Sequence, residues 1–392
     1  MREILQIAIY ELIHVVKDKV LFALIFLGPV AYAVLFCLVY GAALINEVPL
    51  GIVNLDGSTL SREVATAFSN THHFQVIEEI ESFQQLEEGM RNGTVRAGVV
   101  IPEEFSQRVV EHRLTEVKVV YDASNLLWGY NTRKYALEVI NQFSVHYAAG
   151  YLAGLGYTQA EIAKILDSIA CTSEIWYNPT FNYNNFLFMG IIIIIIHQLG
   201  LLSSALTITR EKERNCWLQY LCSPISRTKI FLGKSLLYFI VNFFNYSLLL
   251  WLTAEFLQLK IEGSIALLIC LGLLISLIIT GLGFCVSVLA PNSLQATRYL
   301  MLLSVPLFML SGFTWPKSHM PALLNGLADL IPFTWMVNSF RQLNLKNLGW
   351  VDLGPALLVL GVMAVGSIGA GWWLAKQPYR RKPYPIPTKS KW

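Results

Sequence analysis

The sequence predicts an α-helical polytopic membrane protein with six transmembrane helices and an inserted extracytoplasmic α/β domain. Of its 392 residues, 55% are hydrophobic and only 14% are charged, and the mean hydropathy is +0.51. A water-soluble protein could not bury so much apolar surface. Six runs are continuously apolar over about 20 residues, the length that crosses the hydrocarbon core of a bilayer. Because these runs do not alternate polar with apolar residues, they exclude a closed β-barrel.

The N-terminal segment, residues 1–19, has apolar residues at helical spacing and is predicted to be a cytoplasmic interfacial helix. Arg2, Lys17 and Lys19 would meet lipid headgroups. The alternative is a simple cytoplasmic start to the first span.

The first transmembrane helix is expected within residues 20–45, where the apolar run is Leu21–Ile45. This run is too long for the core of a signal peptide, and no small-residue cleavage site follows it, so an uncleaved anchor is expected. The pair Gly28-Pro29 predicts a kink, which a membrane helix tolerates when its neighbours satisfy the freed carbonyl groups.

Residues 46–185 are predicted to form the extracytoplasmic α/β domain, because short β-prone runs alternate with helical ones. The expected strands are Leu50–Val53, Phe74–Ile77, Ala97–Ile101 and Val117–Tyr121. The expected helices are Ser61–Phe68, Ser82–Arg91, Pro102–Glu111 with proline at its first position, Asn131–Gly154 and Thr158–Ala170.

Residues 186–377 are expected to contain the remaining five transmembrane helices. Their apolar runs are Phe186–Ile208, Ile230–Leu257, Ile265–Leu289, Gln295–Phe313 and Leu353–Ala375. The stretch 311–349 is too polar to cross a membrane and too apolar to lie in water, so an outer re-entrant segment is expected there. Pro316, Pro321 and Pro332 would break its helices, and it carries Arg341. The proline-rich, basic stretch 378–392 is expected to be an unstructured cytoplasmic tail.

The distribution of charge predicts the orientation. Basic residues gather before the first span, between the second and third spans, and at the C-terminus, which places these segments in the cytoplasm by the positive-inside rule. Residues 46–185 hold about 17 acidic and 9 basic residues, a net charge of about −8, against about +11 for the remainder. Both termini are therefore expected to be cytoplasmic.

The charged stretch between the second and third spans, residues 209–229, is predicted to be a coupling loop that docks a soluble partner. Its acidic residues would pair with basic groups on the partner, its apolar residues would lie in an apolar groove as an amphipathic helix, and its proline would end that helix. The residues assigned to this contact are Arg210, Glu211, Glu213, Trp217, Leu218, Leu221, Ser223 and Pro224. The alternative is a solvated loop whose charges only fix the topology.

The same residues carry a resemblance to a known family. Arg210-Glu211-x-Glu213, followed by Leu218, Leu221 and Ser223-Pro224-Ile225, resembles the cytoplasmic loop of the permease subunits of type 2 ABC exporters (ABC-2 type). Asn215-Cys216 stands where that family usually has Gly-Thr, and Gln219 stands where it usually has an acid. Further similar stretches are Val53–Ser61 (VNLDGSTLS), Ser311-Gly312-Phe313 and Ile331-Pro332.

The resemblance implies a permease subunit, not itself an enzyme, of an ATP-driven exporter in the bacterial cytoplasmic (inner) membrane. The chain would bind no cofactor, and ATP and Mg would be bound by a separate ABC ATP-binding subunit. Other implied partners are a second permease copy or paralogue, forming a homodimer or heterodimer, and membrane lipid. A periplasmic membrane-fusion adaptor is a further candidate, and no nucleic acid is expected. The cargo would be hydrophobic or amphipathic, such as a drug, a lipid or a lipid-linked molecule.

The second and fifth spans would line the translocation path, as the resemblance implies. His197 and Gln198 are polar groups inside the second span, and polar residues within a membrane are functional candidates. The alternative for His197 is a neutral histidine that bonds to a neighbouring helix.

No catalytic or metal-binding set stands out in the sequence. Gly233-Lys234-Ser235 looks like the end of a phosphate-binding loop, but Thr228 stands where the first glycine belongs, so we interpret the match as coincidence. His72, His73 and His112 match no metal-ligand spacing. Two alternative functions are a membrane-anchored receptor or adaptor-binding protein and a secondary transporter. The latter is expected to have acidic residues at mid-membrane, and the sequence has none there.

Overall fold

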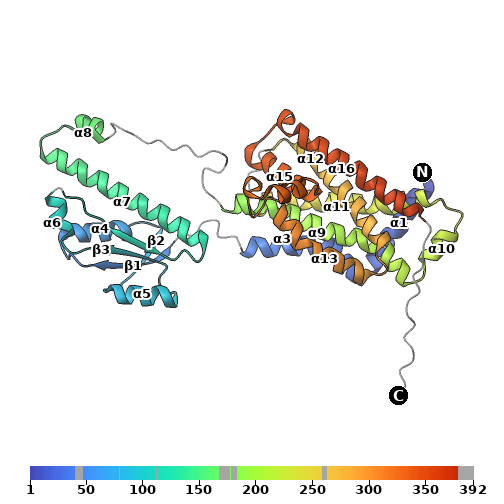
Figure 1. Ribbon diagram of the computed structural model, residues 1–392, viewed down its shortest axis with the longest axis horizontal. Helices are drawn as coiled ribbons and strands as arrows, with labels where there is room; N and C mark the ends of the chain where they lie inside the picture. Colours follow the sequence, from blue (N-terminus) through green and yellow to red (C-terminus); the bar gives the residue numbers. More distant parts are fainter. Residues whose placement is uncertain are drawn as a thin grey trace, which may run out of the picture. The chain divides into compact units, whose positions relative to one another are not determined.

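The computed structural model describes residues 1–39, 47–78, 80–111, 113–166, 177, 183–257 and 263–377. The chain divides into two compact units (Figure 1), one formed by residues 42–174 and the other by residues 1–41 together with 175–392. The expected tail, 378–392, lies outside the described residues, as does the side chain of Leu221.

The smaller unit is built on a four-stranded sheet with the strand order β2-β1-β3-β4. The strands are β1 (Val48–Asn54), β2 (Phe74–Ile77), β3 (Ala97–Ile101) and β4 (Lys118–Tyr121). β1 pairs in parallel with both β2 and β3, and β4 pairs antiparallel with β3. The four strands predicted from β-prone runs are thus confirmed.

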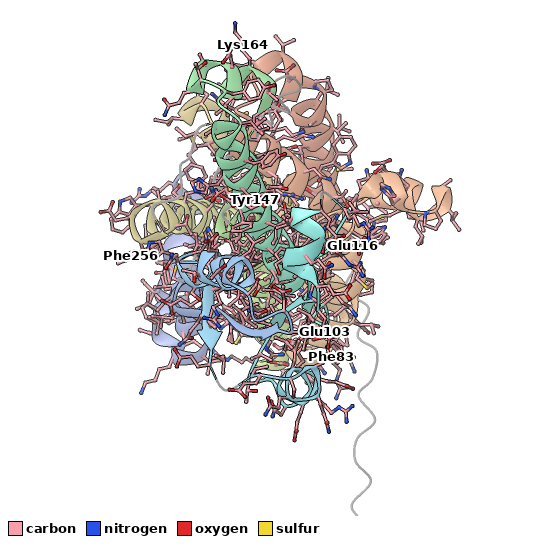
Figure 2. The ribbon with its side chains drawn as sticks, turned by 90° about the vertical axis from the view of Figure 1, so that its left-hand side faces the viewer. Phe83, Glu103, Glu116, Tyr147, Lys164 and Phe256 are labelled. Carbon is pink, nitrogen blue, oxygen red and sulfur yellow. The ribbon has the colours of Figure 1, made fainter. Side chains whose placement is uncertain are left out.

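Helices cover both faces of this sheet. The bounds are α4 (Thr59–Ser69), α5 (Phe83–Asn92), α6 (Phe105–Val110), α7 (Leu126–Gly154) and α8 (Gln159–Leu166). α4 and α7 lie on one face and α5 on the other (Figure 1). All the buried residues of α7 lie within Gly129–Val139. Its second half carries Tyr147, and Figure 2 labels this residue and Lys164 of α8.

The expected helix from Pro102 begins later than predicted. Glu104 has a left-handed backbone (φ 63°), so the helix α6 starts only at Phe105. The Asp56 carboxylate, which follows β1, accepts hydrogen bonds from the backbone N–H (3.3 Å) and the hydroxyl (3.1 Å) of Ser106. This distant residue, and not Pro102, therefore fixes the start of the helix.

The larger unit is helical. Its elements are α1 (Arg2–Lys17), α2 (Lys19–Phe22), a π-helical turn (Ala23–Leu27), α3 (Gly28–Val39), α9 (Tyr183–Glu213), α10 (Trp217–Cys222), α11 (Arg227–Leu257), α12 (Ile265–Leu289), α13 (Ser293–Leu310), a 3-10 turn (Lys317–His319), α14 (Ala322–Asp329), α15 (Pro332–Lys346) and α16 (Trp350–Lys376). Among the described residues, six helices are long and apolar enough to cross a membrane: α2–α3 together, α9, α11, α12, α13 and α16. The predicted fold class is confirmed.

α9 is the most buried of the six and lies in the middle of the unit (Figure 1). Its isoleucines form one core with α12, α15 and α16. α3 and α13 are the opposite case, because most of their apolar side chains are exposed on this chain. α1 packs one face, with Ile7, Ala8 and Val15, against α11, so it is more than a helix that rests on a membrane.

The expected irregularity in the first span is the π-helical turn that precedes Gly28 and Pro29. Because Pro29 has no N–H, the carbonyl of Ile25 loses its helical donor. The side-chain amide of Asn245 on α11 donates to that carbonyl at 3.0 Å. A neighbouring helix thus satisfies the freed group, as predicted.

The segment 311–349 forms short helices at the end of the bundle opposite α1 and α10 (Figure 1). Pro316 and Pro321 precede the 3-10 turn and α14, and Pro332 is the first residue of α15. The guanidinium group of Arg341 lies over the rings of Phe186 (4.5 Å to the centroid) and Phe313 (5.7 Å). The prolines therefore start helices here, and the arginine fastens α15 to α9.

Candidate coupling site and cavity

The predicted coupling loop, 209–229, begins as a continuation of α9, which remains helical to Glu213. A turn follows at Asn215, whose backbone is left-handed (φ 56°), and then the short helix α10. α11 begins at Arg227. α10 thus connects the end of α9 to the start of α11, and it lies at the same end of the bundle as α1 (Figure 1).

The last four residues of α9, Arg210–Glu213, are here called the junction residues, and each of them binds a different element. The first, Arg210, donates to the Asp18 carboxylate at 3.0 Å. The second, Glu211, accepts from the ammonium group of Lys234 on α11 at 2.5 Å. Two neighbouring side chains of α9 thus hold the start of α2 and the start of α11.

The other two junction residues bind helix ends. The ammonium group of Lys212 donates to the carbonyls of Ser287 (3.0 Å), Val288 (2.5 Å) and Ala290 (2.8 Å), where α12 ends. Glu213 accepts from the backbone N–H (2.7 Å) and the hydroxyl (3.0 Å) of Ser293, the first residue of α13. Each charge complements the partial charge of the helix end that it meets.

Asp18 joins α1 to the loop. It is the N-cap of α2, where its carboxylate accepts a hydrogen bond from the Leu21 N–H at 3.2 Å. The same carboxylate forms an ion pair with the guanidinium group of Arg214 at 3.3 Å. Burial by itself would raise the pKa of the Asp18 carboxyl, but the Leu21 hydrogen bond and the charges of Arg210 and Arg214 together hold that pKa below its ordinary value. Asp18 is therefore stabilised as the carboxylate.

Lys234 is the centre of a buried ion triad, formed with Glu11 and Glu211. Its side chain is 0% exposed, and its ammonium group lies 2.5 Å from a carboxylate oxygen of each partner. Burial would raise the pKa of Glu11, but the charge and hydrogen bond of Lys234 outweigh it and the pKa is lowered. The other oxygen of Glu11 accepts from Thr207 (2.8 Å) and Tyr238 (3.0 Å). The triad therefore ties α1, α9 and α11 together.

The helix α10 and the two residues after it include both buried and exposed side chains. Trp217 is only 7% exposed and packs with Ile208 and Phe231, whereas Leu218 is 41% exposed and Pro224 is also exposed. The hydroxyl of Ser223 donates to the carbonyl of Tyr220 at 2.7 Å, within the loop itself.

Glu211, Glu213 and Trp217, which were predicted to contact a partner, also have contacts inside the chain. These side chains already bind within the chain, because the fold brings complementary charges and apolar surface to them. Trp217 is buried and Glu211 is partly buried, whereas Glu213, Leu218 and Pro224 are exposed. The docking of a partner by this loop stays a prediction, and these exposed residues are the ones that a partner can reach.

The two predicted path residues lie in different surroundings. His197 is buried, with its ring over that of Phe333 at 4.4 Å between centroids, and it does not line the neighbouring cavity. Gln198 does line that cavity, and its amide donates to the hydroxyl of Ser304 on α13. Of the adjacent pair, only Gln198 is placed to meet a molecule in this cavity.

The cavity has a volume of about 410 Å³ and lies between α3, α9 and α13. Its lining is mainly aliphatic and aromatic; Tyr32, Phe36, Ile191, Ile195, Phe308 and Phe313 are among the residues that line it. It could hold an apolar molecule of moderate size, with Gln198 and Ser304 as the polar contacts.

Sequence reasoning missed Glu11 and Asp18 and set Lys234 aside as a chance match. A signal was present, since Glu11 shares the buried face of α1 with Ile7, Ala8 and Val15. An acid on the apolar face of one helix and a lysine within an apolar run both need partners. Glu11 and Lys234 could therefore have been predicted to form an ion pair.

The fold and the site first define a class: a multi-pass helical membrane protein with an α/β domain inserted after its first span, and with a charged junction that joins the ends of its spans. Residues 19–373 match the model of the family described as ABC-2 family transporter protein, and the chain belongs to that family. The resemblance predicted from the loop is thereby confirmed, and the chain is an ABC permease subunit.

Three relatives come from Escherichia coli K12. The probable multidrug ABC transporter permease YbhR is 23% identical over 319 residues, which cover 80% of this chain and 83% of the relative. The probable multidrug ABC transporter permease YbhS is 25% identical over 303 residues, covering 75% and 76%. The inner membrane transport permease YhhJ is 25% identical over 392 residues, covering 97% of this chain and 98% of the relative.

Proposed function

We propose that this chain is the permease subunit of an ATP-driven exporter that moves hydrophobic or amphipathic cargo out across the bacterial cytoplasmic membrane. ATP and Mg are bound, and ATP is hydrolysed, by a separate ATP-binding subunit, and a second permease copy or paralogue completes the complex. Both termini and α10 lie in the cytoplasm. The names of the relatives support a multidrug and inner-membrane setting, and the positions of the basic residues support the orientation.

The observation that carries this proposal is the set of contacts made by the junction residues. Four successive side chains of α9 hold the start of α2, the start of α11, the end of α12 and the start of α13. A push on α10 therefore reaches α9 directly and reaches four other elements through it. A loop that served only to fix the topology would not need these contacts.

The cavity supports the class of cargo. A volume of about 410 Å³ lies within the range of small-molecule sites, which is roughly 300–1,000 Å³. Its walls are apolar, and Gln198 and Ser304 supply hydrogen-bonding groups. A drug-sized apolar molecule or the acyl part of a lipid fits this chemistry. α9 connects the cavity to the junction residues, so the same helix reaches both sites.

The exposed face of α10 is the expected docking surface for the ATP-binding subunit. Leu218→Glu places a charge on that face without disturbing the buried Trp217. We expect the ATP-binding subunit, co-expressed with the permease, to co-purify with the wild type and to be lost with Leu218→Glu. Leu114→Glu, at an exposed leucine of the smaller unit, is the matched control. Equal co-purification of the subunit with wild type and Leu218→Glu would contradict this docking surface.

A further inference from the structure

We propose that Lys234 is a positioning residue for energy coupling. Through Glu11 and Glu211 it holds α1, α9 and α11 as one body, so that a displacement of α10 moves the spans and does not merely bend the loop. This inference rests on the proposed function, and it adds a residue that contacts neither ATP nor cargo.

The triad closes the coupling loop on itself. Glu211 lies near the end of α9, just before the turn at Asn215, and Lys234 lies in the first turns of α11. Their 2.5 Å contact therefore joins the two helices that α10 connects. Tyr220 of α10 also lies close, with the ammonium group of Lys234 5.2 Å from its ring centroid. A movement of α10 is therefore transmitted to Lys234 in two ways, through the ring of Tyr220 and through the ends of α9 and α11.

The third arm of the triad brings in α1. Glu11 accepts from Lys234 with one oxygen, and with the other it accepts from Thr207 of α9 and Tyr238 of α11. One carboxylate thus contacts both spans whose ends carry the loop. α1 would move with these spans when α10 is displaced.

Burial makes these contacts stiff. Lys234 is fully buried and Glu11 is 5% exposed, so neither group can exchange its partner for water without a large loss of free energy. The same two helices are bridged a second time by Lys229 and Glu3 at 2.7 Å, but those side chains are 45% and 50% exposed. An exposed pair is weak and readily replaced by water. Lys229 is therefore a natural control for Lys234.

The test follows a conformational signal and needs no knowledge of the cargo. In a variant with all six cysteines replaced, Val305→Cys places one thiol at the cavity, since Val305 lines it and is exposed. The permease is co-purified with its ATP-binding subunit, and the rate of maleimide labelling is compared with and without ATP, Mg and vanadate. ATP hydrolysis is measured on the same complex.

We expect nucleotide to change the labelling rate in the reference protein and in Lys229→Met. With Lys234→Met we expect the complex to hydrolyse ATP while the nucleotide-dependent change shrinks on the order of tenfold, as is typical of a lost coupling between sites. Lys234→Arg, which keeps the charge, should restore part of the change. An unchanged nucleotide response in Lys234→Met would overturn the inference.

Two further outcomes separate instability from uncoupling. Lys234→Met leaves two buried carboxylates without a counter-charge and can fail to fold. The neutral variant Glu11→Gln/Lys234→Met/Glu211→Gln keeps the volumes and removes that strain. We expect this variant to fold, to hold the ATP-binding subunit and to remain uncoupled, whereas normal coupling in it would overturn the inference. If the reference complex captures no ATP-binding subunit, the proposed function itself fails, which is a different result from a coupled Lys234→Met.

Discussion

The two halves of α9 are held by different physical interactions. The half that contains the isoleucines packs apolar surface into the core and beside the cavity. The other half ends in the junction residues, which bind by ion pairs and hydrogen bonds of defined direction. Apolar contacts depend mainly on buried area and tolerate small shifts, whereas charged hydrogen bonds depend on position and angle. The charged half is suited to fixed geometry, and the apolar half to changes of packing around a cargo.

One rigid element connects these two halves. α9 has 31 residues, which corresponds to a length of about 47 Å at 1.5 Å per residue. A tilt imposed at the junction therefore displaces the residues beside the cavity. Three predictions test this contrast between the halves, in order of decreasing effect.

The largest effect is expected at the charged end, from Trp217→Ala. Trp217 is buried against Ile208 of α9, so its removal leaves a void and should lower the free energy of unfolding by about 3–5 kcal/mol. Leu218→Ala, one residue further on but exposed, should change it by less than about 1 kcal/mol. SDS titration of the purified permease in mixed micelles measures both values. Equal effects of the two variants would place Trp217 on a surface and contradict its packing.

An intermediate effect is expected in the apolar half, from Gly190→Ala. A Cβ at position 190 would lie 1.9 Å from a ring carbon of Phe313, which lines the cavity, so this ring must shift. Overpacking of this kind should lower the free energy of unfolding by about 1–3 kcal/mol. It should also change the labelling rate of Val305→Cys without loss of the ATP-binding subunit. Gly366→Ala is the control, because a Cβ there meets nothing within 4 Å; identical behaviour of the two variants would argue against the close contact.

The smallest effect is expected when the pH is lowered, through the protonation of Asp18 at the charged end of α9. The folded-state pKa of Asp18 is lowered, so its stabilisation is present above the unfolded pKa of about 3.9 and is lost as the pH falls through the folded value. At pH 7 and pH 5 the free energy of unfolding of the wild type should exceed that of Asp18→Asn by about 1 kcal/mol, measured as a higher melting temperature. The difference should narrow below about pH 4. A difference that persists undiminished into that range would show that the charge of Asp18 contributes nothing.

Local patterns were sufficient to predict most of the fold. Apolarity is a property of each run taken alone, so the span Ile265–Leu289 is predicted with its observed bounds. Ser82 and Gln85 likewise form the N-cap contacts that a helix from residue 82 requires, within four residues of each other. The start predicted at Pro102 was wrong for the opposite reason, because the hydrogen bonds that determine where α6 begins join Ser106 to Asp56, which lies 50 residues earlier in the chain.

The site could be predicted only in outline. The sequence identified the loop and its residue types, but their partners are remote: Arg210 and Asp18 are 192 residues apart, and Lys234 and Glu11 are 223 residues apart. With no local rule linking them, the charges of the loop were assigned to another protein. Glu211 and Glu213 also bind inside the chain. Glu213, Leu218 and Pro224 are exposed, and whether a partner contacts them stays a prediction.

The hydrogen bonds from Lys212 to the end of α12 also limit the positions at which insertions and deletions can be tolerated. One residue added within α12 would rotate its last carbonyls by about 100° around the helix axis, away from the ammonium group that now meets those of Ser287, Val288 and Ala290. Glu213 requires α13 to begin close by at Ser293, so the short link between these two helices is fixed as well. Across the family, insertions and deletions should therefore avoid the α12–α13 corner and accumulate in the loops of the smaller unit.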